Sequence, residues 1–199
     1  MVSLIPLYKV YTPKGVQRDI GQILTSGKIS YGEHSKLFEK KIRKFIGNNK
    51  ILTVSNNYYA MQIAIDILNL NKGDEIISSP MSCIASHQPI LNNRLRIIWA
   101  DIDPSTGTLD PEDVRKRITA RTKAIVHYHW CGYPGYVDEI NEISRQFGVA
   151  VIEDATEAFG AEFQNKKIGN TGSDLVCFSF QPVRLPNSIE GGAIAFQSN

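Results

Sequence analysis

Residues 178–192 read FSFQPVRLPNSIEGG and join two short apolar runs, at 175–180 and 193–196. The polar residues between the two runs are too few for a domain linker and too irregular for a helix. Open α/β sheets bind their ligands at the carboxyl ends of strands. The stretch therefore predicts a turn between two strands that presents side chains to a ligand.

Short runs rich in Val and Ile recur along the rest of the chain, and segments with helical spacing of apolar residues separate most of them. The expected strands are 51–54, 75–78, 96–101, 124–129, 150–152 ending at Glu153-Asp154, 175–180 and 193–196. The expected helices are 15–24, 34–46, 59–70, 84–92, 111–118 and 137–147. This alternation predicts an α/β fold with a doubly wound, mostly parallel seven-stranded sheet. We expect residues 1–50 to form an N-terminal arm and helices, and residues 51–199 to form a large α/β domain.

The composition is that of an ordinary soluble protein, with 42% hydrophobic and 21% charged residues. A net charge of +2 gives no reason to expect nucleic acid or an anionic membrane as a partner. The lysines and arginine within 36–44 alternate with apolar positions, which indicates the solvated face of a helix. The three cysteines are widely spaced, which suits a reducing compartment. We find no signal-peptide pattern and no apolar run of membrane-spanning length, so we expect a cytoplasmic location.

Two carboxylates, Glu153 and Asp154, follow the apolar run 150–152. A buried aspartate at the carboxyl end of a strand can hold a protonated heterocyclic nitrogen, because each charge lowers the cost of burying the other. Aspartate is equally suited to cap the N-terminus of a following helix. The spacing alone leaves both roles open.

The segment 55–58, SNNY, joins the first expected strand to a helix. Such a junction points backbone N–H groups and the positive end of the helix at a bound phosphate. Simple capping by Ser55 or Asn56 is the alternative, and the absence of glycine, which permits close backbone approach, weakens the phosphate interpretation.

His127 and His129 alternate along one expected strand and therefore share a face. Two histidines without a third ligand nearby do not predict a metal site. No Gly-x-Gly-x-x-Gly fingerprint is present, so a dinucleotide-binding fold is not expected either.

Several motifs in combination carry a family resemblance that covers nearly the whole chain. They are Ser26-Gly27, Phe38-Glu39, GDEII at 73–77, PMSCIAS at 80–86, WADID at 99–103, TKAI at 122–125, HWCGYP at 129–134, IEDA at 152–155 and the stretch 178–192. With these motifs the chain resembles the DegT/StrS-type sugar aminotransferases. Those are fold-type-I enzymes that use pyridoxal phosphate on nucleotide-linked keto sugars. The resemblance implies that residues 51–199 correspond to the large domain of such a transferase.

The resemblance also implies roles for individual residues. Asp154 matches the aspartate that pairs with the pyridinium nitrogen and keeps the ring protonated as an electron sink. Ser179 matches a serine that contacts the cofactor phosphate, and Asn57-Tyr58 matches the turn that cradles that phosphate. Cys83 stands at the position packed over the face of the ring.

At three positions of the expected site the sequence departs from the family pattern. Arg184 occupies the position of the lysine that forms the Schiff base, and a guanidinium has no lone pair with which to attack an aldehyde. Glu157 occupies the position of a Gln or His that contacts the ring hydroxyl, and its carboxylate only accepts hydrogen bonds. Asn57 replaces the glycine of the phosphate cradle, and Tyr58 adds bulk there.

The functional expectation is a homologue of nucleotide-sugar aminotransferases that does not transaminate. Arg184 replaces the lysine, and the C-terminal small domain that family members have after the seventh strand is expected to be missing. Pyridoxal phosphate would then bind without a covalent bond at best. The alternatives are an active aminotransferase, a lysine-less dehydratase-like enzyme, or a non-catalytic nucleotide-sugar-binding or scaffold subunit in which Arg184 holds an anion. The resemblance implies a homodimer or a heteromer with a full-length homologue, and a nucleotide-linked sugar as a possible ligand.

Overall fold

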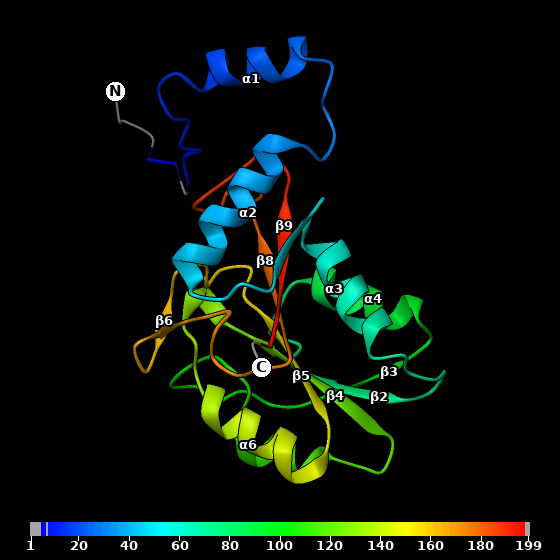
Figure 1. Ribbon diagram of the computed structural model, residues 1–199. Helices are drawn as coiled ribbons and strands as arrows, with labels where there is room; N and C mark the ends of the chain where they lie inside the picture. Colours follow the sequence, from blue (N-terminus) through cyan, green and yellow to red (C-terminus); the bar gives the residue numbers. More distant parts are fainter. Residues whose placement is uncertain (1–4, 7, 198–199) are drawn as a thin grey trace.

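The Val- and Ile-rich runs form one seven-stranded sheet in the computed structural model, which describes residues 5–6 and 8–197 (Figure 1). The strand order is β1-β9-β8-β5-β4-β2-β3. Its strands are β1 (Ile51–Val54), β2 (Glu75–Ser78), β3 (Arg96–Trp99), β4 (Thr122–Tyr128), β5 (Ala150–Asp154), β8 (Leu175–Ser179) and β9 (Gly192–Phe196). Only β9 runs against its neighbours, pairing antiparallel with both β1 and β8. The predicted α/β fold with a mostly parallel seven-stranded sheet is confirmed.

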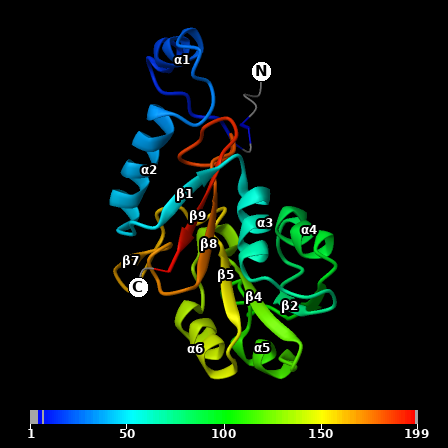
Figure 2. The ribbon, with the colours of Figure 1, turned by 45° about the vertical axis from the view of Figure 1, so that its right-hand side comes forward.

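Helices cover both faces of this sheet, as the alternation of strands and helices predicts (Figure 2). They are α1 (Val16–Thr25), α2 (Glu33–Ile46), α3 (Asn57–Ile67), α4 (Ile84–Asn92), α5 (Pro111–Arg117) and α6 (Val137–Phe147). Helices α3 and α4 pack on one face, and α2, α5 and α6 on the other. Helix α1 stands away from the sheet, and none of its residues is buried (Figure 1).

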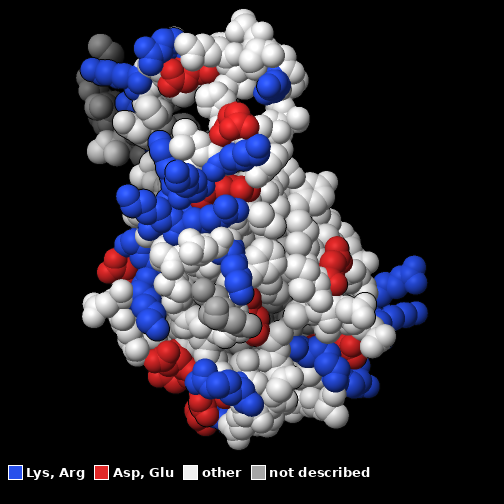
Figure 3. Space-filling model, viewed as in Figure 1, with Lys and Arg blue, Asp and Glu red and all other residues white. Residues whose placement is uncertain are grey.

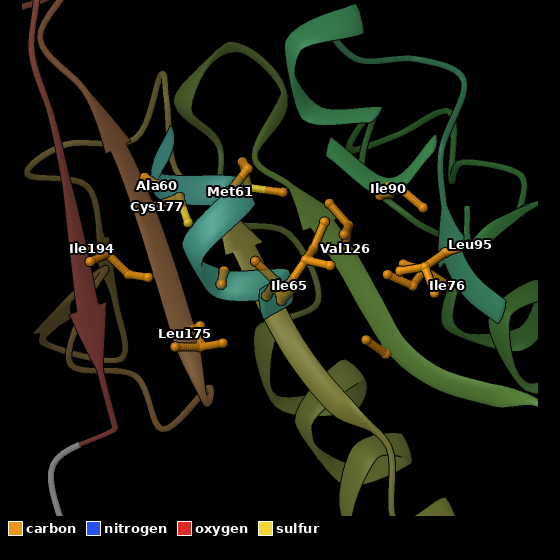
Figure 4. Close-up of a cluster of buried hydrophobic side chains, with 13 residues drawn as sticks. Ala60, Met61, Ile65, Ile76, Ile90, Leu95, Val126, Leu175, Cys177 and Ile194 are labelled. Atoms are coloured by element: carbon orange, nitrogen blue, oxygen red, sulfur yellow. The ribbon is translucent and has the colours of Figure 1, made fainter. Parts of the chain in front are cut away.

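The core is divided by the alternation of side chains along each strand. On β8, Leu175 and Cys177 join the cluster under α3 and α4, which Figure 4 shows. Val176 and Phe178 join the cluster under α2 on the opposite face. Every residue of β8 is buried, which explains why this strand reads as a continuous apolar run rather than an alternating one.

The turn between β8 and β9 is pressed against the start of α3. A Cβ atom added to Gly192 would lie 2.6 Å from the backbone carbon of Asn56 and 2.9 Å from the backbone nitrogen of Asn57. Only glycine therefore allows β9 to pass this close to the junction between β1 and α3. The contact places the end of the stretch 178–192 beside the junction between β1 and α3.

Some boundaries differ from the sequence expectation. Helix α3 ends at Ile67 rather than at residue 70, because Asn69 adopts a left-handed conformation with φ of 48°. A small antiparallel ladder, β6 (Glu162–Phe163) with β7 (Lys166–Lys167), was not predicted. It turns at Gln164 and Asn165, both with positive φ, and without glycine this turn has only a weak sequence signature.

The basic residues of α2 lie on its outer side, where Figure 3 shows blue side chains gathered. Lys36, Lys40, Lys41 and Lys44 are exposed, whereas Ile42 and Ile46 face the core. The prediction of a solvated helix face is confirmed for these lysines, whereas Arg43 is partly buried and donates to the Ile51 carbonyl oxygen and to the buried Glu39. No helix within the described part of the chain is long and apolar enough to cross a membrane.

Candidate functional site

Three polar side chains lie at the carboxyl ends of β4, β5 and β8, on the side of the sheet that α3 and α4 cover. In the register of the sheet, Asp154 pairs with Tyr128 of β4 and with Cys177 of β8, and Ser179 ends β8. Alternation places Tyr128, Asp154 and Ser179 on one face. All three side chains are buried.

Asp154 is fully buried and its carboxylate is held by three donors. Oδ1 accepts the backbone N–H of Thr156, at 3.1 Å, and the Thr156 hydroxyl. Oδ2 accepts the hydroxyl of Ser86, which α4 supplies from the other side of the site. The residues after Asp154 form turns and no helix begins there, so the alternative role as a helix cap is wrong.

At the start of α3 the capping role predicted for Asn56 is confirmed, since its Oδ1 accepts the backbone N–H of Tyr59 at 3.1 Å. Asn57 is buried, and its Oδ1 has no hydrogen-bond partner among the residues that the structure describes. The Tyr58 hydroxyl turns to α4, where it accepts the side-chain amide of Asn92 at 2.6 Å. The two residues of the expected phosphate cradle therefore differ, because the Tyr58 side chain is hydrogen-bonded to α4 and the Asn57 side-chain oxygen is not hydrogen-bonded to any described residue.

Arg184 and Glu157, the two residues that depart most from the family pattern, form an ion pair. Nη1 of Arg184 lies 2.9 Å from Oε1 of Glu157, and the two side chains are 23% and 27% exposed. Oε2 of Glu157 accepts the backbone N–H of Cys131 at 2.9 Å. Burial, together with the negative charges of Glu157 and Asp154, raises the pKa of the adjacent Tyr128 hydroxyl, which is therefore neutral.

The ion pair borders a cavity of about 210 Å³. Its lining consists of Thr156, Glu157, Phe159, Ser179, Val183, Arg184 and Leu185, with no lysine among them. The structure thus brings Arg184, Glu157 and Ser179 together, with Asp154 linked to them through Thr156. Cys83 is exposed at the N-cap of α4, and neither Cys83 nor Asn57 nor Tyr58 lines this cavity.

Several residues of the site were not predicted from the sequence. Thr156 had a local signal, because an aspartate often accepts the N–H two residues on. Ser86 lies 68 positions from its partner Asp154, and Cys131 contributes only its backbone to Glu157. Neither of these two contacts leaves a signal in the local sequence.

His127 and His129 share a face, as their spacing predicts; it is the face opposite Asp154, and both side chains are buried in the core. His129 Nε2 lies 2.6 Å from Oε2 of the buried Glu153, whose Oε1 accepts the Thr171 hydroxyl. The carbonyl oxygen of Pro134 lies within hydrogen-bond distance of both imidazoles. Burial and the neighbouring His129 lower the pKa of His127 to about 4. Within the described ranges, no three His, Cys, Asp or Glu side chains gather as a metal site requires.

Several known proteins are similar to this chain in sequence, in fold or in both. The chain is 32% identical over 192 residues to the uncharacterized protein MJ1066 of Methanocaldococcus jannaschii, covering 96% of this chain and 50% of that one. It superposes on AtS13 of Actinomadura melliaura with a TM-score of 0.90 at 30% identity, covering 96% of this chain and 53% of the other. The sugar aminotransferase CalS13 of Micromonospora echinospora gives a TM-score of 0.91 at 26% identity, with coverage of 97% and 54%.

The chain therefore spans about half the length of these relatives. Residues 13–199 match the DegT/DnrJ/EryC1/StrS aminotransferase family. Together with the shared fold, this match shows that the chain belongs to the DegT/DnrJ/EryC1/StrS aminotransferase family.

Proposed function

We propose that this chain is a homologue of nucleotide-sugar aminotransferases that does not itself transfer amino groups. The observation that carries the proposal is the ion pair between Arg184 and Glu157, which borders the cavity that Ser179 also lines. Arg184 stands where the resemblance places the lysine, and its guanidinium is already committed to a carboxylate of the same chain.

An arginine cannot take over the work of that lysine. A guanidinium stays protonated at any working pH and offers no free electron pair to a carbonyl carbon. It is equally unable to accept a proton as a free amine does. The residues that line the cavity include no other amine, so nothing within this cavity supplies the missing nucleophile.

Pyridoxal phosphate, which the family implies, fits this site only in part. Asp154 is buried on the side of α3 and α4 and could hold a ring nitrogen, and Ser179 lines the cavity, where its hydroxyl would contact the phosphate. Glu157 is an anion where the ring hydroxyl would lie, and Arg184 cannot form the covalent bond. These residues do not fit a covalently held cofactor.

The structure also bears on the alternative in which Arg184 holds an external anion. Its Nη1 donates to Glu157, whereas its buried Nε has no hydrogen-bond partner among the described residues and remains available as a donor. Because position 184 carries no amine, we favour a non-catalytic subunit over an active aminotransferase or a lysine-less dehydratase-like enzyme. A nucleotide-linked sugar as ligand, a homodimer or a heteromer with a full-length homologue, and a cytoplasmic location remain parts of this proposal.

Amino transfer and ligand binding can be measured separately. The chain is incubated with pyridoxal phosphate, glutamate and a nucleotide-linked keto sugar, and formation of the keto acid is followed. We expect no formation above a sample without protein, and calorimetric titration with the nucleotide sugar then reports whether it binds without turnover. Steady formation of keto acid that depends on the chain would contradict the proposal.

A further inference from the structure

We propose that Ser82 is a nucleophilic serine, activated by His87, that accepts an acyl group from an activated ester. Neither residue lines the cavity that Arg184 and Glu157 border. This second site is independent of the proposed function, which concerns amino transfer, and its reaction needs no pyridoxal phosphate.

The imidazole of His87 meets two serine hydroxyls at one nitrogen. Its Nε2 lies 3.0 Å from Oγ of Ser78, the last residue of β2, and 3.1 Å from Oγ of Ser82, which precedes α4. A serine hydroxyl within hydrogen-bond reach of a histidine nitrogen is the arrangement of an activated nucleophile. Ser78 is fully buried, whereas Ser82 is half-buried. Ser82 is therefore the hydroxyl of the two that an ester can reach.

The surroundings of His87 hold the imidazole in place and keep it neutral. The side chain is buried, and its ring packs edge-on against Trp99, with 4.8 Å between the ring centroids. Burial lowers the pKa of His87, against smaller opposing effects of Asp154 and of a hydrogen bond to the Ser79 backbone. A neutral imidazole is the form that can accept a proton from a hydroxyl group.

These groups can carry the acyl transfer with all atoms balanced. Oγ of Ser82 attacks the carbonyl carbon of the ester, and its proton passes to Nε2 of His87. The bond from that carbon to the alkoxide of the ester then breaks, and His87 returns the proton to the alkoxide, so that an alcohol leaves. Between these two steps the nearby charge of Asp154 stabilises the imidazolium. Ser82 retains the acyl group in an ester bond.

The turn that carries Ser82 offers hydrogen-bond donors and an apolar rim to such a reagent. The side chain of Cys83, the N-cap residue of α4, makes no capping hydrogen bond. The first backbone N–H groups of α4 therefore lack a side-chain cap, and they can donate to the oxygen of a carbonyl group. Ile84 is 69% exposed, and Met81 is half-buried on the other side of Ser82. These neighbours favour an ester with a short apolar acyl group.

A fluorophosphonate tests the serine directly, because such a reagent labels activated serines and spares ordinary ones. Oγ forms a bond to phosphorus, the P–F bond breaks, and the serine proton leaves with the fluoride. Intact-mass measurement gives the number of adducts per chain, and peptide mapping locates them. The variants are Ser82→Ala and His87→Gln. The matched control is Ser144→Ala, because Ser144 is also half-buried and its hydroxyl donates to the Val149 carbonyl oxygen at 2.6 Å.

We expect one adduct per chain, at Ser82, and none in Ser82→Ala. General-base assistance contributes about 10²–10⁴-fold, so labelling of His87→Gln should be at least about 100-fold slower. Ser144→Ala should be labelled as fast as the unaltered chain. Thermal unfolding shows whether each variant is folded. If His87→Gln is not, the unaltered chain in urea replaces it, since unfolding separates Ser82 from His87 and should abolish labelling.

The absence of an adduct on the folded, unaltered chain would overturn the inference, and a serine hydrolase in a parallel reaction shows that the reagent is active. An adduct at another residue, equal labelling rates for the unaltered chain and His87→Gln, or labelling that persists in urea would overturn it as well. None of these outcomes bears on the proposed function, which is measured by formation of keto acid.

Discussion

The ion pair between Arg184 and Glu157 predicts a measurable coupling in the stability of the fold. Two unit charges about 4 Å apart attract by about 4 kcal/mol at the effective dielectric of a protein surface. About a quarter of each side chain is exposed, so water screens the pair and part of the attraction offsets lost side-chain freedom. Exposed pairs contribute about 0.2–1 kcal/mol and loss of one partner of a buried pair costs about 3–5 kcal/mol. We therefore expect a coupling of about 1–2 kcal/mol for this pair, which is about three-quarters buried.

Urea unfolding of four proteins measures that coupling at neutral pH. The proteins are the unaltered chain, Arg184→Gln, Glu157→Gln and the double variant, and the coupling is the departure of their unfolding free energies from additivity. The same cycle on Arg145 and Glu142, which are exposed and 2.7 Å apart, should give less than about 0.5 kcal/mol. A coupling for Arg184 and Glu157 no larger than that of the surface pair would refute the reasoning.

Two further predictions concern the buried His127 and the glycine at the start of β9. The pKa of His127 is lowered to about 4, so this histidine stays neutral in the folded chain while the unfolded chain takes up a proton below pH 6.5. Stability should therefore fall as pH falls from about 6.5 to about 4, by up to about 3 kcal/mol, and urea unfolding of His127→Gln should show a smaller dependence over this range. A variant with the same dependence would contradict the assignment. Gly192→Ala should destabilise the chain by about 1–3 kcal/mol, because its Cβ would meet the backbone of Asn56 and Asn57, whereas Gly21→Ala in α1, where nothing lies within 4 Å, should stabilise it slightly. Equal melting temperatures for the two glycine variants would show that β9 tolerates a side chain at this point.

Most of the architecture follows from patterns that are local in the sequence. The β-branched runs and the helical spacing of apolar residues located every strand of the large sheet, since burial on both faces leaves strands such as β8 continuously apolar. Period-two alternation correctly placed His127 and His129 together on one face. The ladder of β6 and β7 escaped prediction, because two residues per strand are too few to show a period.

The composition of the candidate site could be predicted better than its contacts. The motifs identified Asp154, Ser179, Glu157 and Arg184 as residues of one region, and three of them line one cavity. That Arg184 would meet Glu157 was not predicted, because the two lie 27 residues apart on different turns and only the pairing of β5 with β8 brings those turns together. Ser86 and Cys131 were missed for the same reason.

The most direct test of the account is the mass of the unaltered chain after incubation with pyridoxal phosphate and reduction with borohydride. Arg184 leaves the cavity that it lines without a reactive amine. We therefore expect that peptides from this region, including the stretch 178–192, keep their original mass, and that no single lysine is labelled stoichiometrically. One pyridoxyl phosphate group per chain on a single lysine, absent when a nucleotide-linked amino sugar is added before the borohydride, would contradict this expectation.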